Sequence, residues 1–314
     1  MLVLFMGLAP APEVGAQSGV VLVDPTELTV SEPNGQGTFT ITLASRPLSS
    51  VYLTMNVSND QCWASPAYVR IAPDEWDSGA TVRVYAVDDD VDDGTQTCLV
   101  QTGSTLSDDP DYDGLDVDDV TVSVQDDDVA GIDVSPTNLT VSEPSGSSTF
   151  DIVLTSQPTS TVVIPFSTSS GECSVSPPSV SLGISDWETG VTATVYAVDD
   201  DFQDGSQPCD VETERAQSND LNYDRLNPDD VEVTVLDDDS AGVRVIPTQL
   251  TISEPDGTDV FTVTLNTEPT SQVSITLSVS NEECSISSET FALDAVNWSD
   301  GFVVTVTAVD DNLD

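Results

Sequence analysis

The chain contains no histidine and no lysine, and its six basic residues, all arginines, stand against 56 aspartates and glutamates. It therefore lacks the most common general base and the amine nucleophile of enzymes. Its formal net charge of −50 disfavours nucleic acid and anionic membranes, because both are bound by basic surfaces. We expect no enzyme activity and no nucleic-acid partner for this stretch.

Long apolar runs are also missing. No segment after the N-terminus reaches the ~18 apolar residues of a membrane-spanning helix, so we expect no membrane insertion. Residues 1–19 begin MLVLFMGLAPAPEVGAQS, an apolar run followed by small residues but without a positively charged start. This segment is expected to be either a signal peptide or a disordered N-terminus.

The strongest pattern present is an internal repeat of 111 residues. LTVSEP at 28–33 recurs at 139–144 and, as LTISEP, at 250–255, and one tryptophan per copy keeps the same spacing. Such self-similarity indicates a tandem array of equal domains. The predicted domains are 20–128, 129–239 and 240–314, the third being truncated before its last two strands, as expected for part of a longer array.

Within a copy, apolar residues alternate with polar ones, which is the pattern of β-strands and not of helices. GTFTITL at 37–43 and ATVRVYAV at 80–87 are examples. Seven strands in about 110 residues favour an immunoglobulin-like sandwich, so the predicted fold class is all-β. The strands expected in the first copy are 20–31, 37–45, 51–58, 67–72, 80–88, 96–105 and 120–126.

If successive strands run antiparallel, the first, third, fifth and seventh all end at one pole of the domain. The segments that end there are rich in acids, whereas loops such as 46–50 and 73–79 are much less acidic. The carboxylates predicted to converge are those of Glu32, Asp60, Asp88, Asp89, Asp90, Asp92, Asp93, Asp126, Asp127 and Asp128.

Dense carboxylate oxygens without nitrogen or sulfur ligands suit a hard cation, and an all-carboxylate cage favours Ca²⁺ over Mg²⁺, which keeps more of its water. The alternative is a solvated acidic loop of the kind found in halophilic or marine proteins. A calcium-binding loop of the helix–loop–helix type does not fit. If Asp88 takes the first position of such a loop, Asp93 occupies the position that requires glycine.

The cysteines follow the repeat. Cys62 and Cys98 are separated by 36 residues, as are Cys173 and Cys209, whereas Cys284 has no counterpart within the sequence. Two disulfides, Cys62–Cys98 and Cys173–Cys209, are therefore predicted, and they imply an oxidising, extracellular location. Zinc is the rival interpretation, but two cysteines per copy and no histidine fit it poorly.

The SEP motif after the first strand, the strand running into DDD and the closing DDD-x-AG junction together resemble the Calx-beta domain over about 20–314. The resemblance implies seven-stranded sandwiches that bind Ca²⁺ at one pole. It implies these ligands: Glu32, Asp88, Asp89, Asp93, Asp126, Asp127 and Asp128 in the first copy; Glu143, Asp199, Asp200, Asp204, Asp237, Asp238 and Asp239 in the second; Glu254, Asp310 and Asp311 in the third.

A further ligand of that family comes from the loop between the third and fourth strands. Here the loop reads NDQCW, SGECS and NEECS in the three copies. This departs from the G-x-D-Y motif of the family and leaves Asp60, Glu172 and Glu283 open as ligands.

Two functions from different classes follow. The first is an extracellular calcium-binding array whose junctions are stiffened by Ca²⁺, used as a surface adhesin or stalk that contacts a cell-surface or matrix ligand. The second is a passive acidic spacer held by disulfides, without a specific ion, and attached to an enzyme domain elsewhere.

Overall fold

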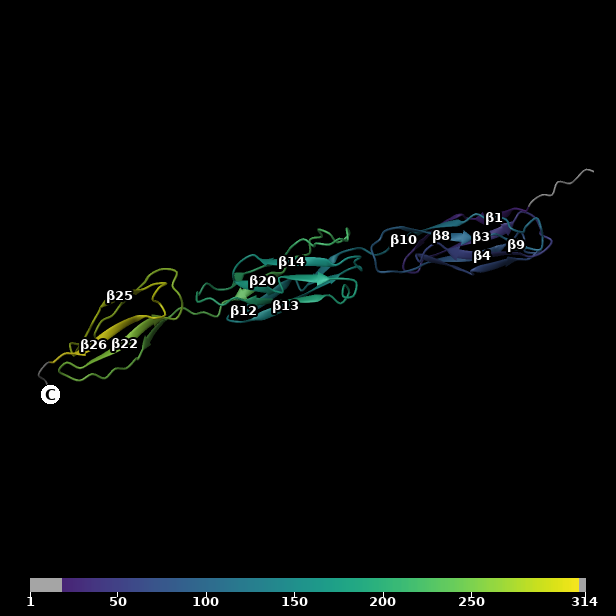
Figure 1. The fold of residues 1–314 in the computed structure, drawn as a ribbon. Helices are drawn as coiled ribbons and strands as arrows, with labels where there is room; N and C mark the ends of the chain where they lie inside the picture. The colour runs from purple at the N-terminus through teal and green to yellow at the C-terminus, as the bar shows by residue number, and fades with distance from the viewer. Residues whose placement is uncertain (1–18, 311–314) are drawn as a thin grey trace, which may run out of the picture. The chain divides into compact units, whose positions relative to one another are not determined.

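The computed structural model describes residues 19–310, and all the regular secondary structure in this range consists of β-strands (Figure 1). The all-β prediction is confirmed. Within the described range, residues 19–130 form one compact unit and residues 131–310 form another. The predicted boundaries at 128 and 239 stay predictions, and residues 1–18 of the predicted N-terminal segment lie outside the described range.

The first unit is a sandwich of two sheets. One sheet has the order β1-β3-β7-β5, and the other has the order β2-β10-β8-β4-β6, with β9 pairing to β4. The strand bounds are β1 Val21–Asp24, β2 Glu27–Ser31, β3 Gln36–Leu43, β4 Val51–Val57, β5 Cys62–Ser65, β6 Tyr68–Ile71, β7 Ala80–Ala86, β8 Gln96–Thr102, β9 Leu106–Ser107 and β10 Val120–Gln125.

Two segments differ from the seven-strand prediction, because each contributes to both sheets. The predicted strand 20–31 is divided at Pro25 into β1 and β2, and the segment around Pro66 forms β5 in one sheet and β6 in the other. Proline has no N–H to donate to a strand ladder, so pairing is interrupted where each strand changes sheet.

The core of the first unit lies between the sheets. The alternating residues predicted to face inward are buried, among them Phe39, Ile41, Val82, Val84 and Val122. Burying a side chain of this size stabilises a fold by about 1.5–3 kcal/mol. The alternation of apolar and polar residues therefore sets which face of each strand packs inward.

The second unit repeats this arrangement once over its whole length and once in part. Around residues 131–239 the sheet orders are β11-β13-β17-β15, β12-β20-β18 and β16-β14-β19; around 243–308 they are β21-β22-β26-β24 and β23-β25. The bounds are β11 Ile132–Ser135, β12 Asn138–Ser142, β13 Ser147–Leu154, β14 Val162–Thr168, β15 Cys173–Ser176, β16 Ser179–Leu182, β17 Val191–Ala197, β18 Gln207–Pro208, β19 Val211–Thr213, β20 Glu232–Leu236, β21 Val243–Ile246, β22 Thr258–Leu265, β23 Val273–Thr276, β24 Cys284–Ile286, β25 Thr290–Leu293 and β26 Phe302–Ala308.

The segment equivalent to β8 consists of two short strands, β18 and β19, with residues 209–210 between them. Backbone pairing continues across these residues, since the Cys209 N–H donates to the Val233 carbonyl at 2.9 Å.

Both predicted disulfides are present, between Cys62 and Cys98 and between Cys173 and Cys209. Cys62 begins β5 in one sheet and Cys98 lies in β8 of the other, so the bond ties the two sheets together. Cys62 lies opposite Ala86, the last residue of β7. The disulfide is therefore close to the end of the sandwich where β2, β7 and β10 finish, which we call the upper end.

Replacing Cys62 and Cys98 by alanine should destabilise the first unit. The 36-residue separation of the two cysteines corresponds to about 4 kcal/mol of lost stability in the chain-entropy account of disulfides. Urea denaturation of the full chain measures this loss. Cys284→Ala is the control, because Cys284 forms no disulfide; equal midpoints for the two variants would contradict the expectation.

Candidate metal centre

The upper end of the first unit is organised by a parallel strand pair. β2 and β10 run side by side in the same direction, with Ser31 opposite Gln125. The Glu32 N–H donates to the Gln125 carbonyl at 2.9 Å. Because both strands end at the same level, Glu32 is placed beside Asp126, 94 positions later in the chain.

The connection between β7 and β8 supplies the next carboxylates. The N–H groups of Asp93 and Gly94 donate to Asp126 Oδ2 at 2.9 and 2.6 Å. Asp89 Oδ1 accepts the N–H of Val91 at 2.9 Å. These bonds fix the acidic loop against the end of β10.

The second repeat builds the same end with equivalent residues. Asp237 Oδ2 accepts the N–H groups of Asp204 and Gly205 at 3.1 and 2.7 Å. β12 and β20 pair in parallel, and the Glu143 N–H donates to the Leu236 carbonyl at 3.0 Å. The local geometry thus recurs with the sequence repeat.

Each of the first two repeats contains one group of three carboxylates. Within a group, one oxygen of each residue lies within 4.8 Å of one oxygen of the other two. The groups are Glu32, Asp126 and Asp128 in the first repeat, and Glu143, Glu172 and Asp200 in the second. Glu172, which the sequence left open, is thereby brought into the cluster. Its signal was an acid directly before the cysteine, repeated at Glu283 but replaced by Gln61 in the first copy.

The other residues predicted as ligands do not belong to these groups. They are Asp88, Asp89, Asp93 and Asp127 in the first repeat and Asp199, Asp204, Asp237, Asp238 and Asp239 in the second. In the third repeat, Glu254 and Asp310 form no such group within residues 19–310, and Asp311 lies outside that range.

One carboxylate of each group is buried, and the other two are half-buried. Glu32 and Glu143 are each only 8 % exposed. Asp128 Oδ2 and its counterpart Asp239 Oδ2 are buried without any hydrogen-bond partner in the described part of the chain. A buried carboxylate oxygen without a partner is costly. A positively charged or hydrogen-bonding neighbour would therefore stabilise these two atoms.

Asp109 and Asp220 show the opposite situation at the other end of each sandwich. Asp109 is 4 % exposed, and its carboxylate accepts the N–H groups of Leu48 at 2.6 Å and Asp111 at 3.1 Å. Asp220 accepts the N–H of Thr159 at 2.7 Å. Neither residue was predicted from the sequence; their signal is the D-x-[DN]-Y-D pattern at 109–113 and 220–224. They anchor loops, and their negative charge is already compensated.

Burial and neighbouring charges shift the acids of the upper end in the same direction. Burial, reinforced by Asp89 and Asp126, raises the pKa of Glu32 to about 7. Burial, followed by Asp126, raises the pKa of Asp128 to about 6. In the second repeat, burial and Asp200 raise the pKa of Glu143 to about 7, although the Asp238 backbone N–H lowers it.

Glu172 follows the same trend, since burial and then Asp200 raise its pKa. The half-buried Asp237 carboxylate behaves differently: the N–H groups of Gly205 and Asp239 lower its pKa. The buried members of the cluster are therefore those whose negative charge is least favourable.

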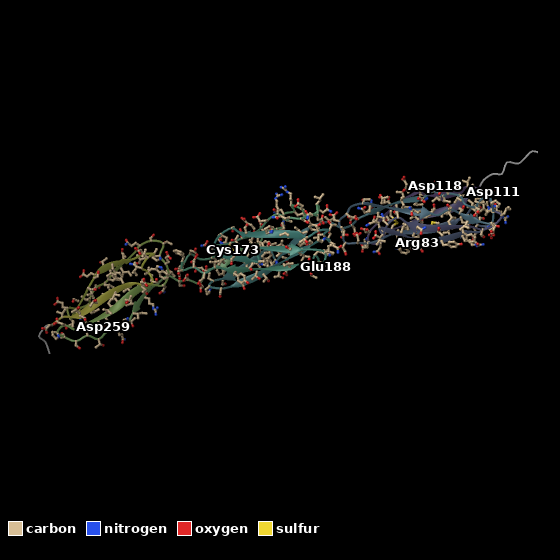
Figure 2. All side chains as sticks on the ribbon, in the orientation of Figure 1. Arg83, Asp111, Asp118, Cys173, Glu188 and Asp259 are labelled. Carbon is tan, nitrogen blue, oxygen red and sulfur yellow. A yellow bond between two sulfur atoms is a disulfide. The ribbon has the colours of Figure 1, made fainter. Side chains whose placement is uncertain are left out.

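Acids are not confined to the upper end, which corrects part of the sequence argument. The connection between β8 and β10 lies at the opposite end, because these two strands are antiparallel neighbours. It carries Asp108, Asp109, Asp111, Asp113, Asp116, Asp118 and Asp119; Figure 2 labels Asp111 and Asp118 of this connection. What distinguishes the upper end is mutual approach and burial of carboxylates, and not acid content alone.

The donor set fits a hard divalent cation. It consists of carboxylate oxygens from separate segments, which Ca²⁺ accepts in flexible geometry. The thiols nearby are bonded in disulfides, and the chain has no imidazole, so a site for zinc or another softer metal is not provided.

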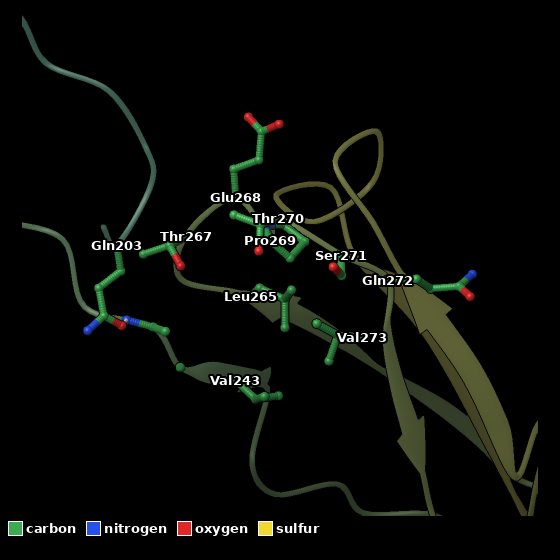
Figure 3. A pocket seen from close by; sticks show the side chains of 12 residues that line it. Gln203, Val243, Leu265, Thr267, Glu268, Pro269, Thr270, Ser271, Gln272 and Val273 are labelled. Atoms are coloured by element: carbon green, nitrogen blue, oxygen red, sulfur yellow. Dashed lines mark hydrogen bonds between the residues drawn. The ribbon is translucent and has the colours of Figure 1, made fainter. Parts of the chain in front are cut away.

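A pocket in the second unit is not lined by any of the clustered carboxylates. It has a volume of about 570 Å³ and is lined by residues including Val243, Leu265, Thr267 and Val273 (Figure 3). By the 111-residue register Thr267 corresponds to Ser45, whose carbonyl accepts the Tyr112 hydroxyl at 2.7 Å. In the first repeat, therefore, a buried tyrosine hydrogen-bonds to the residue at the equivalent position.

Comparison with known proteins finds no matching family model and no matching curated protein. Solved structures with a distant likeness include the calcium binding domain CBD12 of CALX1.1, at 14 % identity, 63 % coverage of this chain, 80 % of that chain and a TM-score of 0.29. The apo form of the Calx CBD1 domain has 18 % identity, covers 36 % of this chain and 100 % of that chain, and has a TM-score of 0.27. The D0-D1 domain of intimin has 15 % identity, covers 68 % of this chain and 98 % of that chain, and has a TM-score of 0.22. TM-scores of this size do not establish a family.

Among residues 19–310 no helix is long and apolar enough to cross a membrane.

Stability should depend on pH when divalent cations are removed. The pKa of Glu32 rises from 4.5 unfolded to about 7 folded, so the folded state binds the extra proton and is favoured at low pH. As pH increases from about 4.5 to 7, this contribution is lost. We expect lower urea midpoints in EDTA at pH 8 than at pH 5.5, and a smaller difference in Glu32→Gln/Glu143→Gln. Midpoints that rise towards pH 8 would contradict this.

Proposed function

We propose that this chain is an extracellular array of tandem β-sandwiches that bind Ca²⁺ at their upper ends. The single observation that carries the proposal is the burial of Glu32 and Glu143, each grouped with two further carboxylates within 4.8 Å. Unpartnered buried oxygens on Asp128 and Asp239 support it. A divalent cation supplies the positive charge that this arrangement lacks.

Ca²⁺ is favoured because it accepts six to eight oxygen ligands in irregular geometry, whereas Mg²⁺ requires a near-ideal octahedron and keeps several waters. Asp126, Asp127 and Asp128 would bind from the end of β10, and Glu32 from the end of β2. Asp88, Asp89 and Asp93 would complete the set from the loop between β7 and β8, and the equivalent residues would do so in the second repeat.

Ion binding would also stiffen the exit from each repeat. Asp126 lies at the end of β10, where its Oδ1 accepts the N–H of Asp128 at 2.8 Å. Two residues later, the N–H of Ala130 donates to Asp92 Oδ2 at 2.9 Å. A cation held by the same segment would restrict the backbone that leads into the following repeat, as suits an adhesin or stalk contacting a cell-surface or matrix ligand.

The location follows from the disulfides, which form and persist in oxidising compartments. We propose a secreted or surface-exposed protein on that basis. Absence of enzyme activity stays a prediction, resting on the lack of histidine and lysine in the sequence.

Calcium should raise the melting temperature of the full chain in a site-dependent way. A ligand that binds only the folded state adds about 2.7 kcal/mol at 100 times its Kd, which corresponds to roughly 4–8 °C for a domain of 60–100 residues. Calorimetry in about 5 mM CaCl₂, compared with NaCl of equal ionic strength, measures the shift in melting temperature. Glu32→Gln/Glu143→Gln should reduce it strongly.

The matched control is Glu27→Gln/Glu188→Gln, which removes the same charge at exposed positions. Glu188 lies away from Cys173, towards the other end of its repeat (Figure 2). If NaCl stabilises the chain as much as CaCl₂ does, the repeats are a passive acidic spacer without a specific ion.

A further inference from the structure

The first and second repeats differ in charge at three positions of the upper end. Asp60 and Asp92 of the first repeat correspond to Gly171 and Gln203, and at the third position the change brings a carboxylate into the cluster. Gln61 precedes Cys62 in the first repeat, and Glu172 precedes Cys173 in the second. The flanking cysteines hold both positions in the same place, since each is bonded to a cysteine 36 residues later. The two sites are therefore alike in framework and unlike in charge.

Gln61 interacts with the cluster as a neutral donor. Its Nε2 donates to Asp89 Oδ2 at 3.3 Å. Asp200 is the counterpart of Asp89, and there Glu172 contributes a second carboxylate, within 4.8 Å of both Asp200 and Glu143. An ionised glutamate has no hydrogen to donate, so at this position the second repeat has no side-chain amide to relieve the repulsion between Glu172 and Asp200.

The second site is more than an accumulation of surface acids. Glu143 is nine-tenths buried, at 8 % exposed, and faces Glu172 and Asp200. Asp239 Oδ2 is buried and has no hydrogen-bond partner within residues 19–310. In the first site Glu32 is equally buried, and Asp128 Oδ2 is buried without a hydrogen-bond partner in the same range.

We infer that Glu172 makes the calcium site of the second repeat tighter than that of the first, so that the two sites fill at different calcium concentrations. The inference rests on the proposed function. Affinity of oxygen-ligand calcium sites is tuned by the charge of their ligands, and Glu172 supplies a carboxylate within the cluster where the first repeat has the neutral Gln61. Gln61 could offer only a neutral amide oxygen, after giving up its bond to Asp89.

Glu283 holds the same position in the third repeat, where Asp311 lies outside the described residues. The inference therefore concerns the first two repeats.

Calorimetric calcium titration of the full chain, after removal of bound metal with a chelator, measures both sites. Glu143→Gln/Glu254→Gln leaves the first site to be measured, and Glu32→Gln/Glu254→Gln leaves the second. We expect the second site to bind about ten-fold more tightly, equal to about 1.4 kcal/mol. In these backgrounds, Gln61→Glu should tighten the first site and Glu172→Gln should weaken the second by a similar factor.

Matched controls separate local contact from net charge. Gln101→Glu adds the same charge to the first repeat at an exposed position of β8, and Glu188→Gln removes the same charge from the second. Both should leave the dissociation constants unchanged.

Equal affinities that neither exchange alters would overturn the inference while leaving the proposed function intact. Equal effects of the exchanges and of their controls would overturn it too, because long-range charge would then explain the result. If neither background binds calcium, the proposed function itself fails.

Discussion

The parallel pairing of β2 with β10 is the constraint on which the upper end of the sandwich depends. Once Ser31 is opposite Gln125, Glu32 and Asp126 must lie next to each other, and the core residues of both strands hold that register. A shift by one residue would turn the buried valines of β10 outward. The cost of bringing the carboxylates together is thus imposed by the packing of the sandwich, and any cation that binds there relieves it.

The two ends of each repeat treat buried carboxylates differently. Asp109 is compensated by backbone N–H groups and serves as a permanent anchor. Glu32 and Asp128 have burial without comparable donors, and the result is a pKa raised to about 7 and about 6. The disulfide between β5 and β8 lies close to the same end. A covalent link can hold the sheets together there even while like charges repel, which leaves the carboxylates available for an ion.

Much of the fold could be predicted from local pattern. Alternation in GTFTITL identified the inward side of β3, and the 111-residue register paired Cys62 with Cys98. The division of the first strand at Pro25 and of the segment around Pro66 was not predicted, because a change of sheet depends on which neighbours are available on each side. The acids of the connection between β8 and β10 were overlooked for a related reason: acid content by itself does not reveal which carboxylates approach one another.

By itself, the sequence determined the all-β class, the repeat, the disulfide pairs and the segments that carry acids, since each is written in a period or spacing along the chain. Only the tertiary structure decided which acids form a cluster. Burial and mutual distance depend on strand register across segments more than 90 residues apart, and these selected Glu32, Asp126 and Asp128 in one repeat and brought Glu172 into the other.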